Sequence, residues 1–252
     1  HLLSRRQRQM CIRDRFACGI EAGDWLYGKK NRNNVIIMKN AIDANQYRYN
    51  EETQNRMREE LGISGKKVIG HVGRFFPQKN HTFLIDIFKA VHDRDSDTVL
   101  LLVGGGEADD ALKNQIRHKV KDLGLEDSVK FLGVREDVEK VVQAFDVFLL
   151  PSLFEGLPVT MVEAQAAGLP CVISDKVPIQ CDITGNVKVV SLEETPEKWA
   201  EVIDDVLKNF KKKDTYETIV NAGFDIKENA KWLKDFYVEA LNCLLYTSPS
   251  PR

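Results

Sequence analysis

Short apolar segments alternate with longer mixed segments along most of this chain, and this alternation constrains the possible fold more than any other feature. Val147-Phe148-Leu149-Leu150, for example, is apolar at every position, as expected for a strand that is covered on both faces. Strands that alternate with helices pair in parallel and carry helices on both faces of their sheet. The sequence therefore predicts an α/β fold. The expected strands are residues 35–38, 68–72, 99–103, 129–132, 147–150 and 171–174, and the expected helices are residues 51–61, 81–92, 109–123, 138–145, 158–167, 196–210 and 227–241.

The two ends of the chain depart from this pattern. The segments Met10 to Asp14 and Cys243 to Ser248 can be encoded by one DNA element and by its reverse complement, and this element resembles a transposase sequencing adapter. We therefore expect residues 1–15 and 243–252 to be translated adapter sequence and exclude both from the fold prediction. The alternative, a basic amino-terminal arm that binds nucleic acid or a membrane, does not explain the shared coding.

The charge of the remaining residues argues against a nucleic-acid partner. The whole chain of 252 residues has a formal net charge of −2. Its two ends contribute six Arg and one Asp, so the part between them carries a net charge of about −7. Nucleic-acid-binding proteins instead present a clustered basic surface.

Cysteine usage indicates a reducing compartment. Cys18, Cys171 and Cys181 remain after the ends are set aside, and this odd number has no metal-ligand spacing. We expect them to be reduced, as in a cytoplasmic protein. No apolar run approaches the roughly 18 residues that a membrane-spanning helix needs.

Glu155 and Glu163 stand out because they flank a Gly-Leu-Pro turn in a nearly apolar stretch. Pro158 suits the first turn of a helix, which places Glu155 in the loop before that helix and Glu163 within it. Open α/β sheets bind ligands at the carboxyl ends of their strands, where this loop lies. A buried carboxylate needs a partner, and in combination with Glu155 and the Gly-Leu-Pro turn at this spacing Glu163 indicates a function. For Glu163 alone, an acid stabilised near a helix amino end explains the position equally well.

A second cluster follows the strand at residues 68–72. The run from Gly73 to Asn80 places the guanidinium of Arg74 and the ammonium of Lys79 in one strand-to-helix loop, at the same sheet edge as Glu155. Arg can bind two phosphate oxygens in parallel, whereas Lys acts as a point charge. Either residue alone could be an ordinary solvated side chain. Together they predict an anion-binding site.

Two further loops at this edge give weaker signals. Gly104-Gly105-Gly106 follows a strand, but Asp109 stands where a dinucleotide fingerprint has its third glycine, so a nicotinamide site is poorly supported. Gly133-Val134-Arg135 follows the next strand and is equally compatible with a plain turn. We expect His71 to be a core residue whose polar atoms are satisfied, and His81 to serve the start of its helix.

These motifs resemble those of a known family. Glu155-x7-Glu163, preceded by Pro151-Ser152 and followed by Ala164-x-Ala166-x-Gly168-x-Pro170, resembles the donor-site signature of retaining GT-B glycosyltransferases. The likeness is greatest to family 4, particularly its members from bacterial polysaccharide assembly. It implies a Rossmann-like sheet that forms the C-terminal half of a GT-B fold. Residues 44–242 would be the nucleotide-sugar-binding domain, and residues 16–43 a remnant of the N-terminal acceptor domain with its linker, in which Ala41 replaces the usual glycine.

The resemblance also implies a role for each motif. Arg74 and Lys79 would hold the donor diphosphate, Glu155 the sugar hydroxyls and Glu163 the ribose, while the loop at Val134 would hold the base. Arg74, Lys79 and Glu155 are the expected catalytic residues. The expected donor-binding residues are Gly73, Arg74, Lys79, Gly104, Gly105, Val134, Arg135, Glu155, Gly156, Leu157 and Glu163.

The implied reaction is retaining transfer of a sugar from a nucleotide-diphospho-sugar, with a UDP-sugar the commonest donor in the family. No Asp-x-Asp motif stands in a suitable loop, so we expect neither a metal nor another cofactor. The acceptor is open, a lipid-linked sugar being one candidate, and the N-terminal domain would bind it. We expect a cytoplasmic enzyme, held at the inner membrane face through that domain. Two alternatives are a nucleotide-sugar 2-epimerase, which the glutamate spacing disfavours, and a non-catalytic nucleotide-sugar-binding module, which turnover would exclude.

Overall fold

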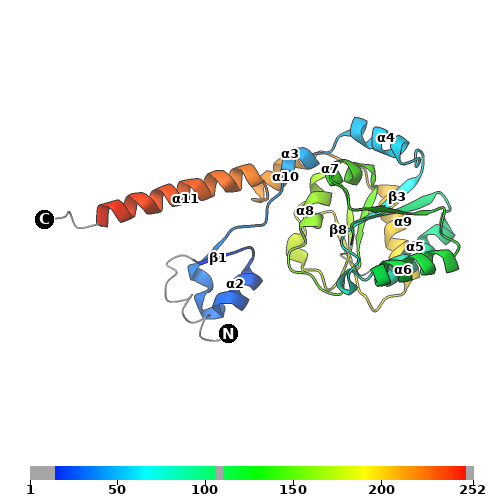
Figure 1. The fold of residues 1–252 in the computed structure, drawn as a ribbon, viewed down its shortest axis with the longest axis horizontal. Coiled ribbons are helices and arrows are strands. Elements are labelled where there is room, and N and C mark those ends of the chain that lie inside the picture. The colour runs from blue at the N-terminus through cyan, green and yellow to red at the C-terminus, as the bar shows by residue number, and fades with distance from the viewer. Residues whose placement is uncertain (1–14, 106–109, 248–252) are drawn as a thin grey trace. The chain divides into compact units, whose positions relative to one another are not determined.

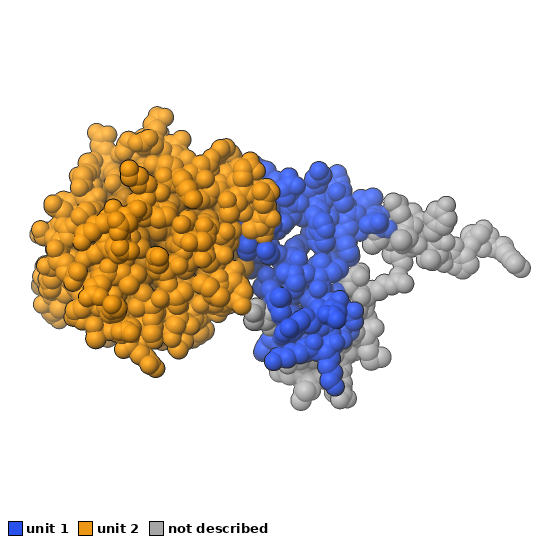
Figure 2. Space-filling view, turned by 180° about the vertical axis from the view of Figure 1, so that it is seen from behind, with its two compact units in different colours: residues 1–41, 223–252 blue, residues 42–222 orange. Residues whose placement is uncertain are grey.

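The computed structural model of this protein describes residues 15–105 and 110–247. The chain divides into two compact units, which Figure 2 colours differently: residues 42–222 form one unit, and the segments 1–41 and 223–252 form the other. The sequence led us to expect domain boundaries after residues 43 and 242. The unit boundary after residue 41 lies two residues before the first expected position. The second expected position lies inside helix α11 (Ile226–Thr247), which belongs to the unit formed by segments 1–41 and 223–252.

Residues 42–222 contain a six-stranded sheet in which all neighbouring strands are parallel (Figure 1). The strand order is β5-β4-β3-β6-β7-β8. The predicted parallel α/β sheet is thus confirmed, and five of the predicted strands lie within one residue of their observed bounds. The strands are β3 (Lys67–Val72), β4 (Thr98–Val103), β5 (Val129–Gly133), β6 (Val147–Leu150), β7 (Cys171–Ser174) and β8 (Val187–Val190).

Helices cover both faces of this sheet and enclose two hydrophobic cores. Successive residues of a strand point to opposite faces. Ile69 therefore belongs to the core on one face, and its neighbour Val68 belongs to the core on the other. The first face is covered by α5 (His81–Arg94), α6 (Asp110–Asp122) and α9 (Pro196–Asn209), and the second by α4 (Glu51–Glu60), α7 (Val138–Val141) and α8 (Val159–Ala166).

Gly70 lies at the centre of β3, where the sheet is buried on both faces. The ring of Phe145 packs directly on this glycine, and a Cβ added to Gly70 would lie only 1.9 Å from Cδ2 of that ring. Phe145 is itself fully buried and precedes β6, which pairs with β3. The absence of a side chain at Gly70 therefore allows the segment leading into β6 to pack closely on the central strand.

Several elements of residues 42–222 differ from the prediction. Strand β8 is not predicted, because it lies at the sheet edge and exposes Lys188 and Val189. The short helices α3 (Ala44–Tyr47) and α10 (Tyr216–Asn221) are not predicted either, since helices of four and six residues are too short to show an apolar period. The helix expected at residues 138–145 is divided into α7 and a 3₁₀ helix, Val142–Ala144.

The second unit, of which residues 15–41 and 223–247 are described, has strands and helices of its own. Its strands β1 (Arg15–Ala17) and β2 (Val35–Ile37) pair in parallel and are joined through helix α2 (Ile20–Tyr27). Only β2 and α11 are predicted from the sequence. Helix α11 continues past the expected end at residue 241, so residues 243–247 of the expected tail are helical, whereas residues 1–14 and 248–252 lie outside the described residues. Among the described helices, none combines the length and the apolar character needed to cross a membrane.

Gly70→Ala is expected to lower the free energy of unfolding by about 1–3 kcal/mol, the usual effect of overpacking a core, because the new methyl group would overlap the Phe145 ring. Denaturant titration measures this change. Gly156→Ala is the matched control: a Cβ there meets no atom within 4 Å, so we expect a change within about 0.5 kcal/mol. Equal losses in the two variants would contradict the packing argument.

Candidate functional site

The candidate site lies where the strand order of the sheet reverses. β3 pairs with β4 on one side and with β6 on the other. After β3 the chain continues to β4 and β5 at one edge of the sheet, and after β6 it continues to β7 and β8 at the other edge. In open α/β sheets, ligands bind in the crevice outside the carboxyl ends of such strands. Here the two flanking loops are residues 73–80 and 151–158. They contain six of the predicted site residues: Gly73, Arg74, Lys79, Glu155, Gly156 and Leu157.

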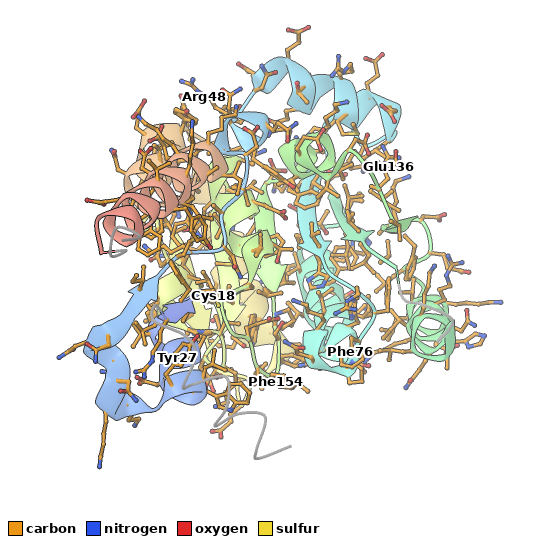
Figure 3. All side chains as sticks on the ribbon, turned by 60° about the vertical axis from the view of Figure 1, so that its left-hand side comes forward. Cys18, Tyr27, Arg48, Phe76, Glu136 and Phe154 are labelled. Atoms are coloured by element: carbon orange, nitrogen blue, oxygen red, sulfur yellow. The ribbon has the colours of Figure 1, made fainter. Side chains whose placement is uncertain are left out.

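Hydrogen bonds join these two loops. The amide of Leu153 donates to the carbonyl of Gln78 at 2.8 Å, and the side-chain amide of Gln78 donates to the carbonyl of Phe154 at 2.8 Å. Figure 3 shows Phe154 and Phe76, one from each loop, at the same end of the sheet, and both rings are exposed. The loops therefore form one connected surface.

Lys79 and Glu155 form an ion pair between the loops. Nζ of Lys79 lies 2.7 Å from Oε1 of Glu155, and Nε2 of Gln78 donates to the other carboxylate oxygen at 3.1 Å. The side chains of Lys79 and Glu155 are only 17% and 7% exposed, so each charge depends on the other for compensation. The structure thus brings these two predicted residues together, and it pairs them with each other, which the sequence did not indicate.

Arg74 presents the other cationic group of the first loop. Its side chain is exposed and makes no hydrogen bond or ion pair with residues 15–105 or 110–247. Beside it, a Cβ on Gly73 would lie 2.9 Å from Nε2 of His71 and 3.3 Å from Cε of Lys79. The guanidinium is therefore available to a ligand, next to a backbone that has no space for a larger residue at Gly73.

The loops after β4 and β5 lie at the same end of the sheet as the loop after β3, next to the carboxyl ends of the strands. Gly104 has a φ of 136°, and a Cβ there would lie 2.1 Å from the carbonyl oxygen of Gly73, so the loops after β3 and β4 approach closely. The amide of Gly104 also donates to the carbonyl of Gly133 at 2.8 Å, which connects the loop after β5. Val134 is 80% exposed, and a Cβ on Gly105 would lie 2.5 Å from its Cγ2.

The side chain of Arg135 is engaged elsewhere. Its Nε lies 2.7 Å from Oδ1 of Asp137, and its Nη2 lies 3.8 Å from Oε1 of Glu60. The hydrogen bond to Asp137 holds the pKa of Arg135 above its usual value. The backbone of Arg135 is thus the part that this residue can offer a ligand. Residues 106–109, including Gly106 and Glu107 of the glycine-rich loop, lie outside the described residues.

Glu163 lies in α8 and accepts a hydrogen bond from a residue that the sequence analysis did not identify. The hydroxyl of Tyr47 donates to Oε1 of Glu163 at 2.9 Å. Burial raises the pKa of Glu163, and this hydrogen bond lowers it in part. Burial and the nearby Glu163 charge also raise the pKa of Tyr47, so the phenol remains a donor. Asp43 caps helix α3, which carries Tyr47, by accepting hydrogen bonds from two backbone amides at its start.

The amino end of α8 offers backbone donors beside Glu155. Pro158 precedes the helix and has no amide hydrogen. The amides of Gly156 and Leu157 donate no hydrogen bond within the described part of the chain. Such amides, aligned with the positive end of a helix dipole, can bind an anion.

Buried polar atoms without a hydrogen-bond partner also gather here. Within the described residues, these atoms belong to His71, His81, Ser152 and Thr160, all in or next to the two site loops. Nδ1 of His71 donates to the carbonyl of Leu149 at 2.9 Å, but its Nε2 has no partner among the described residues. The expectation that the polar atoms of His71 are satisfied is therefore wrong for one nitrogen. Burial lowers the pKa of His71 to about 4 and that of His81 to about 2, so both rings are neutral.

Metal-binding side chains do not cluster in the described residues: no group of three or more His, Cys, Asp and Glu there could hold a metal ion. The charges available at the site are those of Arg74, Lys79 and the two glutamates. This combination can bind an anion through its cations and hydroxyl groups through its carboxylates.

Replacement of Glu163 by Gln is expected to raise the free energy of unfolding at pH 7 by about 1 kcal/mol. Because the folded-state pKa of Glu163 is raised, the carboxyl group disfavours folding more as the pH rises through that value. The amide oxygen of Gln can still accept from Tyr47. Denaturant titrations should show the gain vanishing near pH 4, where unperturbed Glu titrates.

Glu126→Gln, at an exposed position in the same unit, is the control, and it should change the free energy of unfolding by less than about 0.5 kcal/mol at any of these pH values. If Glu163→Gln instead lost stability at pH 7, the hydrogen bond from Tyr47 would outweigh the effect of burial.

Solved structures of glycosyltransferases share this fold. The structure of Anabaena Alr3699/HepE in complex with UDP and glucose matches with a TM-score of 0.72 and 22% sequence identity, covering 88% of this chain and 62% of that one. A glycosyltransferase from Rickettsia africae ESF-5 matches with a TM-score of 0.76 and 16% identity, covering 90% of this chain and 64% of that one. These similarities confirm the predicted fold class.

Curated relatives extend the comparison to sequence. The "Putative glycosyltransferase EpsF" of Bacillus subtilis (strain 168) is 36% identical over 227 residues, which are 88% of this chain and 58% of that protein. An Escherichia coli protein named UDP-Gal:alpha-D-GlcNAc-diphosphoundecaprenol alpha-1,3-galactosyltransferase is 28% identical over 214 residues, 81% of this chain and 54% of that protein. The chain thus spans little more than half the length of these relatives. A family model described as "Glycosyl transferases group 1" matches residues 53–223. Because this match covers more than half of the chain, the chain belongs to this family.

Proposed function

We propose that this chain is the donor-binding part of a glycosyltransferase that moves a sugar from a nucleoside-diphosphate sugar to an acceptor hydroxyl, with retention at the anomeric carbon. The observation that carries this proposal is the Lys79–Glu155 ion pair beside the exposed guanidinium of Arg74, at the switch point between β3 and β6. A diphosphate requires cationic donors and a sugar requires acceptors for its hydroxyl groups. These two loops carry both.

The cations would act on the leaving group. As the bond between sugar and phosphate breaks, negative charge grows on the diphosphate, and fixed positive groups stabilise that charge more in the transition state than in the ground state. Arg74 can donate two parallel hydrogen bonds to phosphate oxygens, and Lys79 adds a point charge. The amides of Gly156 and Leu157 are further donors. In this proposal these groups take the place of a divalent metal, and no cofactor is needed.

The two glutamates would hold the rest of the donor. Glu155 borders the diphosphate site through its pairing with Lys79, which suits it to accept hydrogen bonds from sugar hydroxyls. Glu163 has Oε1 engaged by Tyr47, and its second oxygen would accept from the ribose. The backbone around Gly104, Gly105 and Val134 would hold the base.

The comparisons support a particular donor and setting. Solved structures of the Anabaena protein contain UDP and UDP-glucose, and the name of the Escherichia coli relative specifies UDP-Gal as its donor. We therefore propose a UDP-sugar as the donor. The diphosphoundecaprenol in the same name suggests a lipid-linked sugar as the acceptor, within polysaccharide or glycolipid assembly. Such an acceptor would place the enzyme in the cytoplasm, at the inner membrane face, with a further domain binding the acceptor.

Calorimetry with uridine, UDP and UDP-glucose across four variants tests the assigned roles. Arg74→Ala and Lys79→Ala should each weaken UDP binding by about 1.5–3 kcal/mol, the usual contribution of a hydrogen bond to a charged group, and should change uridine binding little. Glu163→Ala should weaken the binding of all three ligands. Glu155→Ala should matter mainly for UDP-glucose.

Arg56→Ala and Lys188→Ala remove the same charges from exposed positions outside the site, and they should bind all three ligands like the parent. If the four site variants also bound like the parent, the site assignment would be lost. A uniform loss across every ligand in all four would indicate damage to the fold, which thermal denaturation would reveal.

We predict that the chain alone binds UDP-glucose but transfers its sugar negligibly, even with an acceptor present. The chain spans little more than half of its relatives, so we expect acceptor positioning and domain closure to need residues outside it. Product analysis by NMR detects both transfer and anomeric configuration. Robust transfer by this chain would contradict the prediction, and conversion of the donor to an epimer would favour the 2-epimerase alternative.

A further inference from the structure

A cavity lies at the end of the sheet opposite to the candidate donor site, at the amino ends of β3 and β6. Its volume is about 430 Å³, within the roughly 300–1,000 Å³ of cavities that hold small molecules. Its wall includes Lys67, the first residue of β3, Asp146, the residue before β6, and Phe210, the residue after α9. None of the residues assigned to the donor belongs to this wall.

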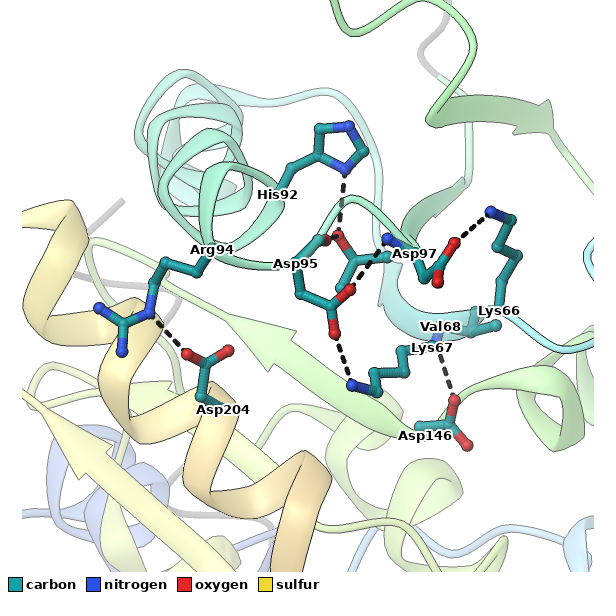
Figure 4. Close-up of polar contacts among 10 residues, drawn as sticks. Lys66, Lys67, Val68, His92, Arg94, Asp95, Asp97, Asp146 and Asp204 are labelled. Carbon is teal, nitrogen blue, oxygen red and sulfur yellow. Dashed lines mark hydrogen bonds and ion pairs between the residues drawn. The ribbon is translucent and has the colours of Figure 1, made fainter.

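Basic side chains predominate in the wall. It contains five basic residues and a single carboxylate, that of Asp146. Carboxylates outside the wall compensate two of these cations: Lys66 lies 2.8 Å from Asp97, and Lys67 lies 2.5 Å from Asp95, as Figure 4 shows. The five basic residues are Arg58, Lys66, Lys67, Lys211 and Lys212.

Asp146 is fully engaged by the fold. One of its oxygens accepts from Nη2 of Arg58 at 2.6 Å, and the other accepts from the backbone amide of Val68 at 2.8 Å. Nε of Arg58 donates to the carbonyl of Ala144 at 3.0 Å. The single acid of the wall therefore makes its hydrogen bonds to Arg58 and to the start of β3, and it forms no ion pair with the other cations of the wall.

Lys211 and Lys212 remain without an acidic partner among the described residues. Nζ of Lys212 donates to the carbonyl of Gln143 at 2.6 Å and lies 5.5 Å from the centre of the Tyr49 ring. Burial lowers the pKa of Lys212 to about 7, with opposing contributions from the attraction of Asp146 and the repulsion of Arg58. Such a partly buried ammonium without a counter-ion is costly, and an anion in the cavity would stabilise it.

The rest of the wall is apolar except for Gln54, whose side-chain oxygen accepts a hydrogen bond from the Tyr49 hydroxyl at 3.1 Å. Val206, Leu207 and Phe210 come from the end of α9, and Tyr49 adds an aromatic ring. A monatomic anion would leave this surface and most of the volume without contacts. Phosphoryl groups carry a charge of about −1.5 to −2 at neutral pH, which would compensate the charge of Lys211 and favour the protonated form of Lys212. An apolar group attached to the phosphoryl group would fill the remainder.

We propose that this cavity binds a small phosphorylated molecule, with its phosphoryl group held by Lys211, Lys212 and Arg58 and its apolar part against Leu207 and Phe210. The site would be distinct from the donor site, since the two lie at opposite ends of the same strands. Its phosphoryl group could belong to a free metabolite or to a lipid headgroup. In both cases the lysines would hold a phosphate monoester, which in a lipid is the headgroup of phosphatidic acid.

Calorimetry with phenyl phosphate and inorganic phosphate tests the proposal. The background is the Arg74→Ala, Lys79→Ala double variant of the 252-residue chain, so that the candidate donor site does not contribute. Phenyl phosphate should bind at least about tenfold more tightly than inorganic phosphate, because only phenyl phosphate contacts the apolar wall. Lys212→Met should weaken its binding about tenfold or more, the effect of one lost charged hydrogen bond.

Lys188→Met is the matched control, since it removes the same charge from an exposed strand position outside the cavity, and it should leave binding unchanged. Lys211→Met, also at an exposed position, should weaken binding severalfold and serves as the second variant if Lys212→Met fails to fold. The proposal would be overturned if lysine replacement at the cavity left binding unchanged.

Sedimentation with vesicles distinguishes the two sources of phosphate. Binding to phosphatidylcholine vesicles that contain phosphatidic acid, but not to vesicles of phosphatidylcholine alone, would assign the site to a lipid headgroup if Lys212→Met abolished it. Binding of phenyl phosphate without sedimentation would assign it to a soluble metabolite. If phenyl phosphate showed no saturable binding at millimolar concentrations and the vesicles did not sediment the protein, the proposal would fail.

Discussion

The parallel pairing of β3 with β4 on one side and with β6 on the other is the interaction on which the rest of the larger unit depends. It buries β3 on both faces and directs the chain toward both edges of the sheet. The loops after β3 and β6 consequently meet, and hydrogen bonds between Gln78 and the loop after β6 hold them together. Gly70 contributes from the centre of β3, since only a residue without a side chain accommodates the Phe145 ring there.

The central part of this fold could be predicted from the sequence, because a strand buried on both faces is continuously apolar over its whole length. The runs from Val147 to Leu150 and from Val99 to Val103 follow this rule. β8 could not be predicted because Lys188 and Val189 face solvent at the sheet edge, where a strand need not be apolar at every position. Helix α3 could not be predicted because its single turn is stabilised by tertiary contacts and by the Asp43 cap, and it has no apolar period of its own.

The site could be predicted only as far as topology determines it. Strand ends place Arg74, Lys79 and Glu155 at one edge, and the structure agrees. Tyr47 could not be found in this way, because its contact with Glu163 joins residues 116 positions apart and depends on the path of the chain before the sheet. The partly buried carboxylate of Glu163 and the His71 nitrogen that has no partner among the described residues both disfavour the folded state, as is common where a protein retains polar groups for a ligand.

The ion pair between Lys79 and Glu155 also bears on how the parts of a donor would influence one another. A diphosphate that draws the ammonium toward itself leaves a nearly buried carboxylate with less compensation, and hydroxyl groups of an attached sugar are suited to restore it. The two halves of the ligand would then bind cooperatively, each making the other's contacts more favourable. A nucleoside diphosphate whose sugar has already left would lose this mutual support. The same two side chains could thereby favour uptake of the intact donor and release of the spent one.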